Sequence, residues 1–226
     1  MNKNCRVIGI TLRGFGRSDK PFGAYNYDFH ARDIKNVLDK LYIKDAVLGG
    51  FSIGGAIAIR YLSVYNGARV SNLVLSAAAA TIWTQRKDFP YNHTQRSVDD
   101  LIALNFKDRP KLLFNFANQF TASEDTLNEG IKNWLNSIGL VATAHATAQC
   151  LYALRDTDLR SDLKKINIPT LIMHGRKDRI CSFDLAEQLK AGIKDSELIP
   201  FKNSGHSLFL EETQKFNTEL IKFAMN

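Results

Sequence analysis

Short apolar runs alternate with helically spaced apolar residues along much of the chain, and this alternation predicts the fold class. Runs of β-branched and aliphatic residues predict strands. These strands are expected at residues 7–12, 46–51, 70–75, 169–174 and 196–201. Helices are expected from the apolar spacing at residues 27–41, 53–62, 183–192 and 208–225. Such alternation is typical of an α/β protein with a mostly parallel sheet, flanked by helices and joined by right-handed crossovers.

The strand pattern disappears in the middle of the chain, where helical patterns replace it. Helix starts are predicted at Ser97, Pro110 and Ser123, because hydroxyl side chains cap helix N-termini and proline fits the first turn. We expect one domain in three segments: the first part of the core (1–79), a helical cap insertion (80–165) and the second part of the core (166–226).

The composition fits a globular protein without a nucleic-acid partner. Of the 226 residues, 45% are hydrophobic and 23% are charged, which is ordinary for a folded domain. The formal net charge is +7, from 30 Lys and Arg residues against 23 Asp and Glu residues. Basic residues are dispersed, and the longest basic runs, such as Lys164-Lys165, are pairs. The charge therefore predicts a basic surface, and we expect no nucleic-acid partner.

Cysteine usage and hydropathy predict a cytoplasmic protein that does not associate with membranes. The three cysteines, Cys5, Cys150 and Cys181, are odd in number and lack a paired spacing, which favours a reducing compartment. The first residues lack the apolar stretch of a secretory signal, and no apolar run has the length needed to span a bilayer.

We expect neither a metal nor another cofactor. His30, His93 and His145 are isolated from Cys, Asp and Glu at ligand spacing. The Gly-Phe-Gly sequence at residues 14–16 is superficially similar to a dinucleotide-binding loop, but Asp19 stands where the third glycine is required.

A glycine-rich pentapeptide at residues 50–54, Gly-Phe-Ser-Ile-Gly, joins a predicted strand to a predicted, almost wholly apolar helix. A turn of this kind exposes its serine, so Ser52 is a candidate nucleophile. The turn is sharp and requires small residues on both sides; Gly50 and Gly54 meet this requirement, and Gly55 extends it. The pentapeptide alone is weakly specific, and the alternative is an ordinary surface serine in a glycine-rich turn.

Two further candidates follow later strands: Asp178 lies just past the strand at 169–174, and His206 lies past the strand at 196–201. Loops after the carboxyl ends of parallel strands gather at one edge of a sheet, so Ser52, Asp178 and His206 are expected to converge. The serine would attack an acyl carbonyl, the histidine would take its proton, and the aspartate would orient the imidazole. The alternatives are a turn serine, a helix-capping aspartate and a polar loop histidine.

Other residues compete less well for these roles. Asp184 lies inside a helical pattern and Asp195 precedes a strand, so neither is placed like Asp178. His174, which precedes Gly175 at a strand end, is expected to have a structural role.

Four segments in this order resemble the α/β-hydrolase family, specifically its esterase and non-haem chloroperoxidase-like branch. They are residues 12–21 (LRGFGRSDKP), 49–55 (GGFSIGG), 174–178 (HGRKD) and 203–207 (NSGHS). The resemblance covers essentially the whole chain. It implies an α/β-hydrolase fold with a helical cap, a serine hydrolase without a cofactor, a possible perhydrolase or haloperoxidase side activity, and a small-molecule acyl substrate.

The backbone N–H of Ile53, which follows the candidate nucleophile, is expected to be one oxyanion-hole donor because it lies at a helix N-terminus. Members of the family normally begin with further strands and a His-Gly-rich loop that supplies the second donor. The resemblance therefore implies an N-terminally truncated core, with the second donor outside this chain.

Aromatic residues suggest a substrate pocket beneath the cap, lined by Trp83, Phe89, Trp134 and Phe209, with ordinary core packing as the alternative. The competing function is an inactive truncated fragment or pseudo-enzyme that at most binds a small hydrophobic ligand.

Overall fold

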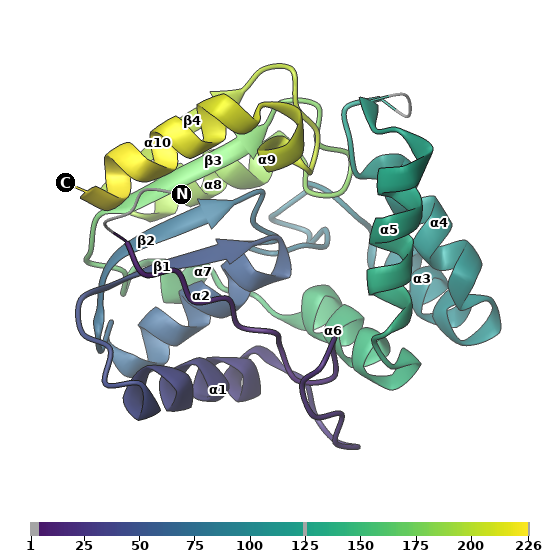
Figure 1. Cartoon of the computed structure of the whole chain (residues 1–226), viewed down its shortest axis with the longest axis horizontal. Helices are drawn as coiled ribbons and strands as arrows, with labels where there is room; N and C mark the ends of the chain where they lie inside the picture. The colour runs from purple at the N-terminus through teal and green to yellow at the C-terminus, as the bar shows by residue number, and fades with distance from the viewer. Residues whose placement is uncertain (1–4, 124–125, 226) are drawn as a thin grey trace.

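The computed structural model describes residues 5–123 and 126–225 and contains a parallel sheet flanked by helices (Figure 1). The sheet order is β1-β2-β3-β4, and every neighbouring pair is parallel. The strands are β1 (Ala46–Phe51), β2 (Val70–Ser76), β3 (Thr170–Gly175) and β4 (Ser196–Phe201). These bounds confirm four of the five predicted strands, and the parallel order places all their carboxyl ends at one edge.

Helices cover both faces of this sheet. One face carries α1 (Tyr27–Lys40), α2 (Ile53–Tyr65), α7 (Arg160–Leu163) and α8 (Phe183–Gly192), whose apolar side chains share one core cluster with the strands. The other face carries α10 (Thr213–Met225), where Phe216, Leu220 and Phe223 pack on the sheet. The sequence pattern explains the burial of α2: its residues 56–59 are at most 1% exposed, as expected for a helix that is apolar on nearly every side.

Four longer helices lie within the predicted cap segment, on the side of the molecule to which the strands point (Figure 1). They are α3 (Gln95–Lys107), α4 (Arg109–Gln119), α5 (Glu129–Leu140) and α6 (Ala144–Asp156). A polar side chain caps each helix by accepting a backbone N–H of its first turn. The capping residues are Thr94, Asp108, Asn128 and Thr143. The boundaries of the cap as a separate unit stay a prediction.

Two of the predicted helix starts are wrong. Thr94 rather than Ser97 caps α3, because the Thr94 hydroxyl accepts the Ser97 N–H at 3.1 Å. Similarly, α5 begins well after Ser123, because the Asn128 side chain accepts the Ile131 N–H at 3.0 Å. The predicted start near Pro110 is confirmed, since this proline lies in the first turn of α4.

Two further expectations need correction. Residues 7–12 form no strand, and Val7 is 65% exposed, because no described strand pairs with this segment. The helix expected at 208–225 is broken at Glu212 into α9 (Leu208–Glu211) and α10, with Glu212 at φ −123° and ψ 52°. The break lets the Glu212 carboxylate accept the Asn203 N–H from the preceding loop.

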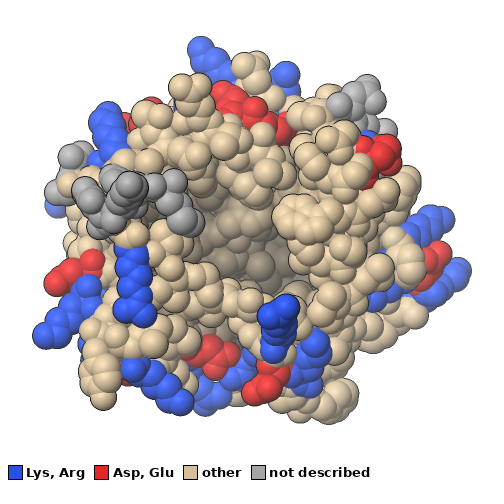
Figure 2. All heavy atoms as spheres, viewed as in Figure 1, with Lys and Arg blue, Asp and Glu red and all other residues tan. Residues whose placement is uncertain are grey.

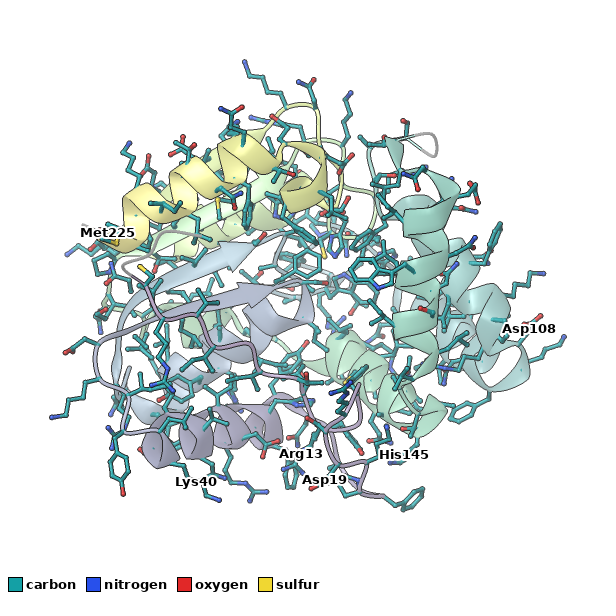
Figure 3. All side chains as sticks on the ribbon, in the orientation of Figure 1. Arg13, Asp19, Lys40, Asp108, His145 and Met225 are labelled. Carbon is teal, nitrogen blue, oxygen red and sulfur yellow. The ribbon has the colours of Figure 1, made fainter. Side chains whose placement is uncertain are left out.

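The loop at residues 13–25 contacts both α1 and the cap helix α6. Figure 3 shows Arg13 and His145 on the same side of the molecule. His145 on α6 stacks on Phe22, with ring centroids 4.3 Å apart. Arg13 forms an ion pair with Asp33 on α1, with Nε to Oδ2 at 2.5 Å. Within residues 5–123 and 126–225, no helix combines the length and apolar character required to cross a bilayer.

Candidate active site

Ser52 lies on a strained turn between β1 and α2. Its backbone angles are φ 53° and ψ −122°, a conformation that L-residues seldom adopt and that costs about 1–3 kcal/mol. The backbone is held in this conformation on both sides. Its N–H donates to Ser76 O at 3.0 Å, and its C=O accepts the N–H groups of Gly55 and Ala79 at 2.9 and 3.0 Å.

The glycine requirement at this turn is only partly as predicted. A Cβ at Gly50 would overlap the backbone of Gly54, so Gly50 is required for the close approach of strand and helix. A Cβ at Gly54 would meet no atom within 4 Å, whereas a Cβ at Gly55 would lie 2.5 Å from the Ala78 Cβ. The tight positions are therefore Gly50 and Gly55.

Asp178 is a buried carboxylate in the loop after β3, with both oxygens hydrogen-bonded. Its Oδ1 accepts the backbone N–H groups of Ile180 and Cys181 at 2.8 and 2.9 Å, and its Oδ2 accepts His206 Nδ1 at 2.8 Å. His174 Nε2 lies 3.4 Å from the same Oδ2. Burial acts to raise the pKa of Asp178, but the interactions with His206 and His174 outweigh it and hold the pKa below its ordinary value. The side chain is therefore ionised at neutral pH.

His206 is fully buried in the loop after β4, and only one of its ring nitrogens is paired. Nδ1 donates to Asp178, whereas Nε2 has no hydrogen-bond partner among the described residues. Because the carboxylate oxygen accepts, Nδ1 is the donor of this pair, and Nε2 is the ring nitrogen left to interact with another group. The loop fits closely against the end of β3, because a Cβ at Gly175 would overlap the carbonyl groups of Ser204 and Gly205.

The structure brings Asp178 and His206 into direct contact and places the Ser52 turn beside them. The Phe51 ring, one residue before Ser52, lies 4.8 Å from the His206 ring between centroids. No hydrogen bond joins Ser52 Oγ to His206 Nε2 within the described part of the chain. Catalytic hydrogen bonds are often longer without substrate and shorten in the complex, so this geometry is compatible with a serine and base that meet on binding.

Aromatic side chains surround the His206 ring. Besides Phe51, the Phe120 and Phe116 rings lie 5.7 and 6.4 Å from it, and Phe209 contacts the Phe51 ring at 5.2 Å. Only Phe209 was singled out as a pocket residue from the sequence. Phe116 and Phe120 are four positions apart at the end of α4, a spacing typical of one helix face, but this spacing does not indicate that the face meets the loop that carries His206.

The other three predicted pocket residues, Trp83, Phe89 and Trp134, differ in their surroundings. Trp83 and Phe89 are buried in a packed cluster between cap and sheet, and Trp83 Nε1 donates to Ile180 O at 3.1 Å. Phe120 belongs to the same cluster, and Phe51 and Phe209 pack against it, so a role of Trp83 and Phe89 in a substrate pocket stays a prediction. Trp134 on α5 lies outside this cluster and is 59% exposed.

Figure 2 shows a hollow in the face viewed in Figure 1, between the sheet and the cap helices. Its walls show neither basic nor acidic residues, which lie around the rim and on the outer surface. Among the described residues, no group of three His, Cys, Asp or Glu side chains is placed to hold a metal ion. Ile53 is the first residue of α2, so its N–H has no acceptor within the helix.

Comparisons with known proteins agree with this fold. A family model described as alpha/beta hydrolase fold matches residues 2–213. The AB hydrolase superfamily protein YisY of Bacillus subtilis is 47% identical over 219 residues, covering 97% of this chain and 81% of the relative. A putative non-heme chloroperoxidase of Synechocystis is 33% identical over 230 residues, covering 99% of this chain and 82% of the relative.

The solved structure of an esterase from Exiguobacterium antarcticum superimposes with a TM-score of 0.94 at 41% identity, covering 96% of this chain and 81% of that one. The chain therefore belongs to the α/β-hydrolase family of enzymes, as its four sequence segments indicated.

Proposed function

We propose that the chain is a serine hydrolase that acts on a small ester or related acyl substrate, with Ser52, His206 and Asp178 as its catalytic triad. The observation that carries this proposal is the 2.8 Å hydrogen bond from His206 Nδ1 to Asp178, together with a free Nε2 beside the Ser52 turn. The similarity to a structurally characterised esterase supports the same reaction class.

In the proposed mechanism, Ser52 Oγ attacks the acyl carbonyl while His206 Nε2 takes its proton. Asp178 stays ionised and stabilises the imidazolium, as the lowered pKa of its carboxyl allows. The Ile53 N–H stabilises the developing oxyanion, while His206 returns the proton to the leaving alcohol. Water then attacks the acyl-enzyme by the same route and regenerates Ser52.

The surroundings of His206 favour an uncharged substrate. Phe51, Phe116, Phe120 and Phe209 surround the base, and the walls of the hollow in Figure 2 show no Lys, Arg, Asp or Glu. Such a surface stabilises apolar acyl or alcohol groups by burial and offers no counter-ion to a charged one. We include the cap at residues 80–165 in this proposal, because Phe116 and Phe120 belong to it.

A cytoplasmic location, favoured by the free thiols of the cysteines, is also proposed.

Perhydrolysis is the second candidate reaction, favoured by the similarity to a putative non-heme chloroperoxidase. Hydrogen peroxide would replace water in the second step, so the acyl-enzyme would yield a peroxy acid and free Ser52. The same three side chains would serve both reactions.

The test is covalent labelling with a fluorophosphonate, read by intact mass and peptide mapping. The wild type is expected to gain one adduct at Ser52, and Ser52→Ala is expected to gain none. Ser63→Ala is the matched control, because it removes another serine hydroxyl, from within α2, and should label like the wild type. A folded wild type that gains no adduct at Ser52 rejects the proposal and favours the pseudo-enzyme.

A further inference from the structure

The loop that carries His206 is built against one end of the cap. Ser207 N donates to Phe120 O at 2.9 Å, just past the C-terminus of α4. A Cβ at Gly205 would lie 2.5 Å from the Thr121 carbonyl carbon, so the two backbones are in direct contact. We call residues 118–122 the cap hinge segment and residues 202–207 the histidine loop.

One carboxylate joins these two segments. Glu211 Oε1 accepts the Ala122 N–H of the cap hinge segment at 2.7 Å. Its Oε2 accepts the Gly205 N–H at 2.8 Å and the Ser207 hydroxyl at 3.1 Å, both in the histidine loop. A carboxylate satisfies these donors because both of its oxygens are acceptors only.

The neighbouring Glu212 makes a useful contrast. Its Oε2 accepts the Asn203 N–H at 3.2 Å and the Ser204 hydroxyl at 2.6 Å. Both donors belong to the histidine loop, so Glu212 stabilises that loop without reaching the cap. Glu211 and Glu212 therefore hold the same loop, but only Glu211 joins it to the cap hinge segment.

The loop that carries Asp178 contacts the same part of the cap. Arg179, next to Asp178, donates from Nη2 to Asn118 O at 2.6 Å and to Thr121 O at 3.3 Å. The cap hinge segment is thus bonded to the loops of both Asp178 and His206. A displacement of this segment is expected to move the imidazole, because Asp178 is the hydrogen-bond partner of the His206 ring among the described residues.

We propose that Glu211 is a positioning residue that sets the place of the His206 imidazole by bonding the histidine loop to the cap hinge segment. This inference rests on the proposed function, since it assigns His206 as the base. Glu211 is bonded to backbone and to Ser207 rather than to the site cavity, so its loss should act on kcat and leave KM nearly unchanged. A misplaced catalytic group commonly lowers turnover by about ten- to a hundredfold.

Two substitutions test whether Glu211 must join the histidine loop to the cap hinge segment. Glu211→Gln keeps the length but supplies one acceptor oxygen, and its amide N–H groups face a donor on the other side. Glu211→Asp keeps the charge but is shorter by one methylene and does not span the two segments. Both are expected to lower kcat for an ester and the rate of fluorophosphonate labelling at Ser52 by about tenfold or more. Glu212→Gln is the matched control and should have a clearly smaller effect.

Hydrogen exchange of the backbone amides supplies a readout that does not depend on catalysis. In Glu211→Gln, exchange at Ala122 and Gly205 should rise together, whereas in Glu212→Gln it should rise only near Asn203. Unchanged exchange at Ala122 in Glu211→Gln would contradict the link between Glu211 and the cap hinge segment. Wild-type kcat in Glu211→Asp, or equal losses in Glu211→Gln and Glu212→Gln, overturns the positioning role. A wild type that does not label overturns the proposed function instead, so the two failures are distinguishable.

Discussion

The two halves of the candidate site are held by different means. Asp178 and His206 are fixed by side-chain hydrogen bonds, with two backbone N–H groups and one imidazole on a single carboxylate. Ser52 is fixed by its backbone, and its hydroxyl makes no hydrogen bond to His206. The acid–base half therefore contributes its catalytic contacts to folding stability, whereas the nucleophile half stores strain and leaves its reactive group free.

Charge also distinguishes the two halves. Asp178 is kept ionised, because its pKa is held below the ordinary value by its histidine partners. On the nucleophile side, Ile53 packs on a cluster that includes Tyr25 and Cys150, and buried His30 lies 3.8 Å from the Cys150 Sγ. Burial lowers the pKa of His30 to about 4 and raises that of Cys150 to about 12, so this cluster is neutral at pH 7.

Asp178→Asn and Ser52→Ala should both abolish most of the activity but differ in their effect on the free energy of unfolding. Both should lower kcat/KM for an ester by about 10³-fold or more, since each removes a member of the proposed triad. Asp178→Asn should also lower the free energy of unfolding by about 2 kcal/mol, because an amide does not accept from all the donors around it. Ser52→Ala should change it by less than about 0.5 kcal/mol. Ester turnover and urea denaturation measure both quantities, and equal stability losses would remove the contrast.

The strained turn supplies the next prediction. Gly50→Ala should destabilise the fold by about 3 kcal/mol, because the added Cβ overlaps the backbone of Gly54. Gly54→Ala is the matched control: it meets no atom within 4 Å, and alanine favours a helix over glycine by about 1 kcal/mol, so this variant should be at least as stable as the wild type. Thermal unfolding of the two variants measures both changes in stability. Similar losses of stability in both would contradict the packing described for the turn.

The pH dependence of stability should sharpen the contrast in charge. The pKa of His30 is lower in the folded chain (about 4) than its ordinary 6.5, so the unfolded state binds more protons between these values. Stability should therefore fall as pH drops from 6.5 to 4, by about 3 kcal/mol. Asp178 contributes in the same direction but at lower pH, because the lowered pKa of its carboxyl preserves its stabilising effect until the pH falls below the ordinary value of about 4.

This slope is measured by urea denaturation at a series of pH values. His30→Gln removes the titrating group and should flatten the curve between pH 6.5 and pH 4. A variant with the same slope as the wild type would assign the loss of stability to another group.

The sequence was most informative where local pattern decides structure. The alternation around residues 46–65 fixed β1 and α2, because an apolar run and an apolar helix have few other ways to be buried. The strand-end positions of Asp178 and His206 predicted their meeting, since parallel strands present their carboxyl ends at one edge. Residues 7–12 show the limit of this reasoning, because a β-branched run forms a strand only when another strand pairs with it.

Contacts between distant segments could not be predicted in the same way. Glu211 bonds to Ala122, 89 positions away, and only the packing of the cap on the histidine loop brings the two together. The approach of Phe120 to His206 has the same origin. The tight position at Gly55 rather than Gly54 depends on Ala78, in the loop after β2. In each case the decisive neighbour comes from another part of the chain.

The most direct test of the central claim is a crystal structure of the protein after reaction with a fluorophosphonate. The account predicts phosphorus bonded to Ser52 Oγ, the Ile53 N–H donating to the phosphonyl oxygen, and His206 Nε2 within hydrogen-bond distance of the adduct. The His206 Nδ1 bond to Asp178 should be retained. An adduct on another residue, or an adduct at Ser52 with the imidazole turned away from it, would contradict the account.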